Sequence, residues 1–455
     1  MSFVAKTKTV DMCNGSLFKS LIRFSVPLML SGILQLFFNA ADVVIVGKFA
    51  GDESLAAVGA TTTLINLLTN LFIGLSVGAN VLVANYYGAR QEKDVHETVH
   101  TSMTISAFSG VFLTVVGVVA APFLLSLMQT PDEVIDLSVI YLRTYFVGMP
   151  AVMIYNFGSA ILRAAGDTKR ALYILFASGV VNVLFNMLFV IVFKWDVFGV
   201  GFATVISQIM SAVLIVICLV KEKSLVRLEL KKLRIYKDKL FRILQIGIPA
   251  GFQGMMFSLS NVVIQSSING FGKVAVAASA ASVSVEGFAF TSMNAFHQAA
   301  VSFTSQNIGA GKYNRINKIL YISLFYVVLV GVFFAFLFLG FGKNLIGFYT
   351  SSPDVIAEGV KRLSIIAGAY FFCGLMDVTS GSLRGMGYSF TPMIVSLVGV
   401  CLFRVVWVAT IFQIDKFHTI EIIYYSYPIT WFLTFTAHFI TFLVAKHRLK
   451  KKLSV

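Results

Sequence analysis

The chain has 455 residues, of which 57% are hydrophobic and only 13% are charged, and it carries a formal net charge of +15. Soluble globular domains usually contain about 45–50% apolar and about 25% charged residues, so this composition excludes an ordinary water-soluble protein. The basic charge does not indicate a nucleic-acid-binding protein either, because no basic motif with interleaved aromatic residues stands out.

Apolar runs of roughly 20 residues, the length of helix that crosses about 30 Å of hydrocarbon, recur along the whole chain. They predict an all-α integral membrane protein with about twelve transmembrane helices. In chain order, the expected ranges are 17–46, 54–80, 97–122, 134–158, 171–194, 198–220, 240–269, 276–302, 316–342, 357–381, 392–414 and 421–446. The two long ranges that contain Pro27 and Pro249 near their starts are expected to kink or break there.

Lysine and arginine are distributed unevenly between the two sides of the predicted membrane. Most of the 36 basic residues fall in the N-terminus, the C-terminus and the loops that follow every second helix. The positive-inside rule makes this side cytoplasmic, so we expect a multi-pass protein of the cell membrane with both termini in the cytoplasm. The densest basic stretch, KEKSLVRLELKKLRIYKDKLFR (221–242), is expected to be an amphipathic connector that lies against anionic headgroups of the lipid bilayer.

This connector separates two halves of similar sequence. For example, FSVPLMLSGILQLFFN (24–39) resembles IGIPAGFQGMMFSLSN (246–261). Six spans per half is an even number, so the halves enter the membrane in the same orientation and are related by an axis along the membrane normal. We therefore predict an N-terminal six-helix lobe (1–220), the connector (221–242) and a C-terminal six-helix lobe (243–455), arranged pseudo-symmetrically around a central cleft.

Several stretches of the chain resemble one known transporter family. They are SVPLMLSGILQLFFNAADVVIVGKFAGDESLAAVG, LRAAGDTKRALYI, GVGFATVISQ, SQNIGAGKYNR and DVTSGSLRGMG, and together they resemble the multidrug and toxic compound extrusion (MATE) family over roughly 24–440. The resemblance implies a two-lobed antiporter that exports mostly cationic, amphipathic compounds by alternating access in exchange for H⁺ or Na⁺. Composition and repeats alone indicate only a two-lobed secondary transporter.

A carboxylate lies in the first expected span. Gln35, Asn39 and Asp42 are spaced so that they share one face of a helix. Ionisable residues within spans usually face a cavity or a partner, because their exposure to lipid is unfavourable. We therefore expect Asp42 to face a polar cavity and to exchange a proton or Na⁺ for a substrate cation. The alternative is an acid at the outer membrane edge that contacts headgroups.

The resemblance adds neutral partners for this carboxylate. The residues expected to couple the cation in the first half are therefore Asp42 and Asn39 from their shared helix face, together with Asn182, Asn186 and Thr204, which the resemblance implies. Asn186 stands where the family usually has an aspartate, so a single carboxylate remains, and it matches one proton or one Na⁺. The candidate Na⁺ ligands are Asp42, Asn182, Asn186 and Thr204. Alternatively, the two asparagines only join helices, at about 0.6 kcal/mol per hydrogen bond.

The second half contains two further candidates for cation coupling, Asp377 and Glu286. Asp377 matches an aspartate that one branch of the family uses to bind cations. Arg404 occupies the position that Asn182 has in the first half. It can neutralise Asp377 or Glu286 in a structural ion pair, and this alternative would leave no free site there.

Polar, aromatic and methionine side chains within several spans are expected to line a substrate cavity, since methionine-rich surfaces adapt to varied ligands. The candidates are Gln35, Phe38, Asn156, Gln253, Met256, Asn261, Gln265, Met293 and Arg404. In a chain with 43 phenylalanines, ordinary helix packing is the alternative explanation for the apolar members of this set.

No pattern indicates an enzyme. The chain lacks a Walker motif, which argues against direct ATP drive, and His297 and His438 have no evident catalytic partners. The four cysteines show neither zinc-site nor disulfide spacing. We therefore predict a protein that is not an enzyme. The resemblance implies drug-like substrates and no cofactor besides the coupling ion, and we expect the protein to function as a monomer.

A flippase for lipid-linked oligosaccharides is the alternative function, because such proteins can share the two-lobed architecture. It would need several basic residues to hold a pyrophosphate, and the candidates are Arg143, Lys361, Arg362 and Arg404.

Overall fold

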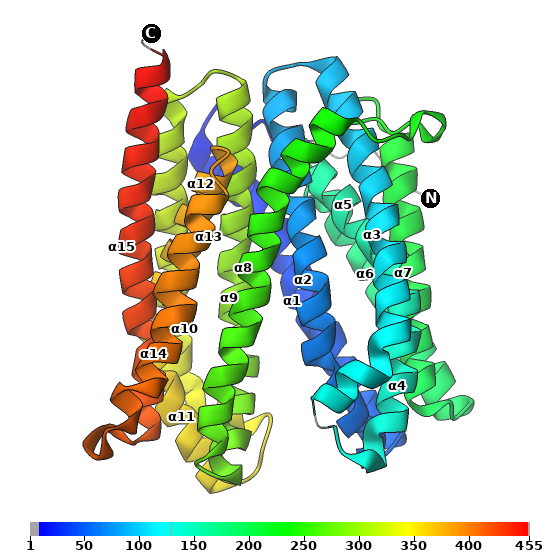
Figure 1. The fold of residues 1–455 in the computed structure, drawn as a ribbon, viewed down its shortest axis with the longest axis vertical. Coiled ribbons are helices and arrows are strands. Elements are labelled where there is room, and N and C mark those ends of the chain that lie inside the picture. Colours follow the sequence, from blue (N-terminus) through cyan, green and yellow to red (C-terminus); the bar gives the residue numbers. More distant parts are fainter. Residues whose placement is uncertain (1–8, 129, 454–455) are drawn as a thin grey trace. The chain divides into compact units, whose positions relative to one another are not determined.

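The computed structural model describes residues 9–128 and 130–453, and within them every regular element is helical (Figure 1). In chain order the α-helices are α1 (Leu17–Phe49), α2 (Asp52–Gly88), α3 (Glu92–Leu127), α4 (Asp132–Val147), α5 (Met149–Ala164), α6 (Lys169–Asn186), α7 (Asp196–Val220), α8 (Lys237–Asn269), α9 (Lys273–Gly309), α10 (Asn314–Gly347), α11 (Pro353–Ala367), α12 (Tyr370–Gly385), α13 (Phe390–Ser396), α14 (Phe403–Ala409) and α15 (Ile420–Leu453). The π-helical segments are η2 (Met187–Val192) and η4 (Leu397–Leu402), and the 3₁₀ turns are η3 (Leu230–Lys232), η5 (Ile411–Gln413) and η6 (Asp415–Phe417).

The prediction of an all-α membrane fold is confirmed. In the described part of the chain, nine helical segments are long and apolar enough to cross a membrane, and the bent pairs α4–α5 and α11–α12 raise the number to eleven. The remaining predicted range, 240–269, coincides with α8, which falls outside that criterion. Each of the twelve expected ranges therefore corresponds to one helix or one broken helix.

The breaks do not lie where the prolines of the long helices suggested. Pro27 and Pro249 are both inside uninterrupted helices, α1 and α8, so the expected break does not occur at either, whereas a kink within these helices stays a prediction. The bends are 47° between α4 and α5 and 50° between α11 and α12. At the first bend Pro150 lies at the start of α5, where its fixed φ and missing N–H favour a new helix start.

The described residues form two compact units. Unit 1 holds the residues up to Asp11 together with Leu30–Met255, and unit 2 holds Met12–Met29 together with the residues from Met256 onward. The boundaries thus fall inside α1 and α8, whereas the sequence suggested boundaries on either side of the connector. The connector and the first part of α8 belong to unit 1.

In unit 1, glycines bring α2 and the first part of α8 into backbone contact. Gly74 and Gly78 on α2 face Gly247 and Gly251 on α8, and each pair has the spacing of a GxxxG motif. A Cβ added at Gly74 would lie 2.2 Å from the Gly251 Cα, and one at Gly78 would lie 2.4 Å from a backbone oxygen. Small residues at this spacing allow close helix packing in membranes, so these glycines fix the crossing.

The connector is attached to unit 1 by buried and polar contacts. Val226 and Leu228 are each 1% exposed and belong to an apolar core built on α2, α3, α5 and α7. The Glu229 backbone N–H donates to His100 Nε2 at 3.0 Å. Leu230 and Leu233 are exposed beside basic residues, so the connector is amphipathic; its contact with lipid remains a prediction.

Next to the connector, Arg170 joins two acids. It forms ion pairs with Asp167 and with Glu222, and Asp167 Oδ1 accepts the Arg170 backbone N–H at 3.1 Å, which caps the start of α6. Partial burial alone would raise the pKa of Glu222, but hydrogen bonds and charge from Arg170 outweigh it and hold that pKa below its ordinary value of 4.5. The ionised Glu222 side chain therefore links the end of α7 to Arg170 on α6.

In unit 2, the first part of α1 packs on α9. Asn307 Nδ2 donates to the Met12 carbonyl at 2.9 Å, and Lys312 Nζ donates to the Cys13 carbonyl at 2.9 Å. Phe24 and Phe303 meet edge to face, with ring centroids 5.4 Å apart. The segment that precedes α1 and the first turns of this helix are therefore firmly held in unit 2.

Candidate functional site

In unit 1 a polar cluster is built from α1, α6 and α7. Asn186 Nδ2 donates to Asp42 Oδ1 at 2.5 Å and lies 3.4 Å from Asn182 Oδ1. Asn182 Nδ2 in turn lies 3.4 Å from Thr204 Oγ1. The structure thus brings together the four residues that were proposed as Na⁺ ligands from the sequence.

A glycine permits this meeting of helices. A Cβ added at Gly179 on α6 would lie 1.9 Å from Cε2 of Phe38, so the ring of Phe38 packs directly on the α6 backbone. Phe38 and Asp42 lie one helical turn apart on α1, so they share a face. The π-helical segment η2 begins directly after Asn186, and such segments occur frequently at functional sites.

The cluster contains a buried oxygen that no donor satisfies. Asn186 is fully buried, and its Oδ1 has no hydrogen-bond partner. Leaving such an acceptor unpaired costs about 1–3 kcal/mol. Together with the carboxylate of Asp42, this oxygen suits a proton or a hard cation, since Na⁺ and similar ions prefer oxygen ligands. Among the described residues, no group of three or more His, Cys, Asp or Glu side chains could hold a metal ion.

Gln35 and Asn39, the other two polar residues on the same face of α1 as Asp42, lie outside this cluster. Gln35 and Asn39 are exposed, whereas Asp42 is half-buried. In the described structure, no hydrogen bond connects Asn39 to Asp42, Asn182 or Asn186. Of the three polar residues on this face of α1, only Asp42 therefore takes part in the hydrogen-bonded cluster.

Two tyrosines near Asp42 were not singled out from the sequence. Tyr141 and Tyr145 on α4 pack in the same apolar cluster as Ile45 and Val46, which follow Asp42 on α1, and their rings are 6.2 Å apart. The two tyrosines lie one helical turn apart in YLRTY (141–145), which could have indicated a shared face. Nothing in this apolar segment of the sequence indicated that the face points toward Asp42.

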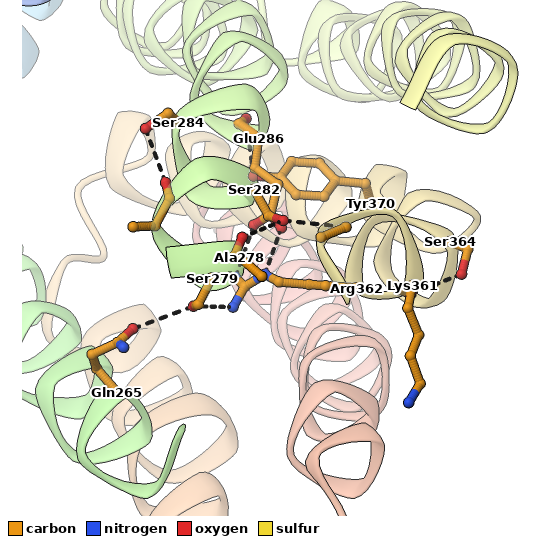
Figure 2. A network of polar contacts seen from close by, with 12 residues as sticks. Gln265, Ala278, Ser279, Ser282, Ser284, Glu286, Lys361, Arg362, Ser364 and Tyr370 are labelled. Carbon is orange, nitrogen blue, oxygen red and sulfur yellow. Dashed lines mark hydrogen bonds and ion pairs between the residues drawn. The ribbon is translucent and has the colours of Figure 1, made fainter. Parts of the chain in front are cut away.

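In unit 2, Glu286 on α9 is neutralised by Arg362 on α11 (Figure 2). Arg362 Nε lies 2.9 Å from Glu286 Oε1, and Arg362 Nη2 lies 3.2 Å from Glu286 Oε2. Both residues are buried, at 2% and 7% exposure. The alternative that Arg404 neutralises Glu286 is therefore wrong, because Arg362 reaches Glu286 with the geometry of a two-point contact. No ion pair between Arg404 and Asp377 is present among the described residues either.

Gln265 is linked to this ion pair. Arg362 Nη1 donates to Ser279 Oγ at 2.9 Å, and Ser279 Oγ donates to Gln265 Oε1 at 3.3 Å (Figure 2). Gln265 Nε2 also donates to Asn269 at 3.0 Å. These contacts place Gln265 in a structural network around Glu286, and they leave Glu286 paired rather than free.

Arg404 is buried without an acid. It is 3% exposed, its Nε donates to Thr430 Oγ1 at 3.1 Å, and its Nη2 has no hydrogen-bond partner. Its guanidinium carbon lies 4.0 Å from the ring centroid of Tyr427 and 5.9 Å from that of Trp431. A desolvated cation–π contact contributes about 2 kcal/mol, less than the several kcal/mol needed to bury a charge. The charge of Arg404 is therefore only partly compensated.

The remaining candidates lie in varied surroundings. Asp377 is half-buried on α12, and its carbonyl accepts a 2.7 Å hydrogen bond from His297. Met293, at 2% exposure, belongs to the apolar core of unit 2. Asn156 donates to Val152 within its own helix at 2.9 Å. Of the others, Gln253 is buried in unit 1, Met256 is half-buried and Asn261 is exposed in unit 2.

The comparisons with known proteins identify the family. The family profile MatE matches residues 27–188 and again 249–410, which together are more than half of the chain and repeat the internal duplication. The chain belongs to the MATE family. Members of this family are multidrug efflux transporters rather than enzymes, so the chain is a multi-pass membrane transporter.

Relatives support this assignment along most of the chain. The probable multidrug resistance protein YoeA of Bacillus subtilis (strain 168) is 28% identical over 84% of this chain and 84% of its own length. The probable multidrug resistance protein NorM of Thermotoga maritima is 25% identical over 84% and 83%. A solved structure of a multidrug resistance MATE family transporter in an outward-facing conformation has a TM-score of 0.91 at 22% identity, covering 98% of this chain and 99% of that chain. It shows the same fold.

Proposed function

We propose that this MATE protein exports amphipathic, mostly cationic compounds in exchange for H⁺ or Na⁺ by alternating access, with Asp42 as the coupling residue. The observation that carries the proposal is the contact of Asp42 with Asn186, whose Oδ1 is buried without a donor. A carboxylate beside an unsatisfied oxygen is suited to a proton or a small cation that comes and goes. The multidrug names of the relatives agree with such cargo.

Coupling follows from charge. One carboxylate binds one proton or one Na⁺, and an organic cation competes for the same negative charge. The cluster spans α1, α6 and α7, so occupation by the small ion draws these helices together. Its release leaves Asp42 charged and favours the arrangement of helices that accepts a cationic substrate. A coupling ion thereby shifts the equilibrium between conformations by its differential affinity.

No observation favours the flippase. Its candidate basic residues are largely engaged elsewhere: Arg362 pairs with Glu286, Lys361 pairs with Glu421, and Arg143 donates to the Val118 carbonyl at 3.1 Å. Arg404 alone does not provide the several cations that a pyrophosphate needs.

We further infer that the protein works as a monomer in the cell membrane with both termini in the cytoplasm; the extreme ends lie outside the described residues. The basic loops support this orientation. The lipid bilayer and drug-like substrates are its expected partners, and the coupling ion is the only additional component required.

The test uses purified full-length protein in sealed proteoliposomes with rhodamine 123, a cationic amphiphile. A proton gradient and a sodium gradient are imposed separately. We expect rhodamine 123 to dissipate at least one gradient faster in proteoliposomes than in protein-free liposomes. If rhodamine 123 moves without any effect on either gradient, antiport is contradicted.

A further inference from the structure

Among the described residues of unit 2, two buried arginines lie beside one tyrosine, and one of the two has no acidic partner. Arg362 and Arg404 both lie over the ring of Tyr427, at 5.6 and 4.0 Å from its centroid. Only one of them has an acid, because Glu286 is bound to Arg362 through two contacts. The Nη2 atom of Arg404 is buried without a partner. Charged groups removed from water are normally paired, and the Arg404 guanidinium has no carboxylate partner among the described residues.

The internal repeat sharpens this contrast. Arg404 is equivalent to Asn182, which belongs to the cluster around Asp42 in unit 1. The position equivalent to Asp42 in the second half is Ile264, which is buried at 1% exposure. The same pair of positions thus carries an acid with an amide in unit 1, and an aliphatic side chain with a guanidinium in unit 2. The sign of the charge is reversed.

The guanidinium is also held in a fixed orientation. Its Nε donates to Thr430, and the guanidinium lies over the rings of Tyr427 and Trp431. Arg404 lies in α14, which directly follows the π-helical segment η4, a kind of segment that is frequent at functional sites. A planar guanidinium whose buried Nη2 has no acceptor can donate to an oxyanion.

We propose that Arg404 is an anion-binding site, and that it takes the carboxylate of a zwitterionic amphipathic compound. The assignment of this compound to the transported substrates rests on the proposed export function. The side chain is 3% exposed in this conformation, so the carboxylate enters when the surrounding helices of unit 2 open during the cycle. The chain then accepts compounds with an anionic group as well as simple cations.

Rhodamine 110 and rhodamine 123 test this directly, because the second dye is the methyl ester of the first and differs only at the carboxylate. Binding of each to purified full-length protein in detergent is followed by fluorescence anisotropy. For Arg404→Gln we expect rhodamine 110 affinity to fall by about tenfold, with rhodamine 123 affinity changed less than about twofold. Arg404→Lys, which keeps the charge but not the planar fork, is expected to lose only part of the rhodamine 110 affinity.

The control is Arg143→Gln, which removes an arginine bound to a backbone carbonyl and should change neither dye. If Arg404→Gln does not fold, the comparison of wild type with Arg404→Lys still decides, since the ratio of the two affinities must shift. An unchanged ratio in both variants contradicts the proposal. If inorganic phosphate displaces rhodamine 110 from the wild type but not from Arg404→Gln, this supports oxyanion binding at Arg404. No gradient is present, so failure of antiport and failure of this site are separate outcomes.

Discussion

Asn186 Nδ2 lies 2.5 Å from Asp42 Oδ1, and this hydrogen bond joins α6 to α1 within unit 1. One helical turn before Asp42 on α1, the ring of Phe38 rests on Gly179 of α6, and we expect the hydrogen bond to depend on this contact. The geometry of the proposed coupling site is therefore set by an apolar contact as much as by its polar atoms.

Gly179→Ala should reduce ion-coupled transport, because the new Cβ would lie 1.9 Å from Phe38 Cε2 and push α1 away from α6. Overpacking of this kind usually costs about 1–3 kcal/mol, so we expect a decrease of about tenfold in gradient-driven rhodamine 123 uptake by proteoliposomes. In a Phe38→Ala background, where the ring is absent, adding Gly179→Ala should reduce the uptake much less than it does in the wild type. No loss in Gly179→Ala would show that this contact does not position Asp42.

Glu286→Gln should destabilise the protein strongly, because it leaves the Arg362 guanidinium buried at 2% exposure without its acid. Removing one partner of a buried pair costs about 3–5 kcal/mol. The double variant Glu286→Leu/Arg362→Met should be more stable than Glu286→Gln. Cys218 and Cys373 are buried, so their reaction with a thiol-reactive dye during heating reports unfolding. A double variant as unstable as Glu286→Gln would contradict the electrostatic origin of the effect.

Two glycines of α2 should respond in opposite directions to alanine. Gly78→Ala places a Cβ 2.4 Å from the Ile243 carbonyl oxygen, which belongs to the backbone and cannot move away easily; we expect a loss of about 1–3 kcal/mol. Gly59→Ala meets nothing within 4 Å and should be neutral or stabilising by up to about 1 kcal/mol. The same thermal assay compares them, and equal melting temperatures would refute the close α2–α8 contact.

Glu222 should make stability depend on pH. Its pKa in the folded protein lies below its ordinary value of 4.5, so the unfolded chain binds the proton more tightly. The stabilisation is fully present above about pH 4.5 and is lost as the pH falls through the lower, folded pKa. Because the side chain is partly exposed, we expect about 1 kcal/mol or less. The melting-temperature difference between wild type and Glu222→Gln should shrink on acidification; a constant difference would contradict this.

The sequence was sufficient to predict the helices, because apolar runs of spanning length leave few alternatives to a membrane helix. The partners of Asp42 came from the family resemblance, which implied Asn182, Asn186 and Thr204. Asn39, which was expected from its place on the same helix face, lies outside this cluster. The alternative that Arg404 pairs with Glu286 was wrong. Arg404, Arg362 and Lys361 are all basic residues near spans, and the rotation of each helix decides which of them reaches the acid. Arg362 reaches α9 only because of how α11 lies in the fold.

The bends and the close helix crossing were missed for related reasons. Pro27 and Pro249 attracted attention as prolines in long helices, yet the bend forms where Gly148 precedes Pro150. The motifs GLSVG and GIPAG carried the signal for the crossing of α2 and α8. Small residues at this spacing become informative only when the partner helix is known.

The most direct test of the coupling role of Asp42 compares Asp42→Asn with Asp52→Asn in sealed proteoliposomes. Asp52 is an exposed acid at the start of α2, so its variant controls for loss of a carboxylate. Uptake of rhodamine 123 is measured with and without an imposed proton or sodium gradient. We predict that Asp52→Asn retains gradient-driven uptake, whereas Asp42→Asn shows the same slow uptake with and without a gradient. Gradient-driven uptake of wild-type rate in Asp42→Asn would contradict the role of Asp42 as the coupling residue.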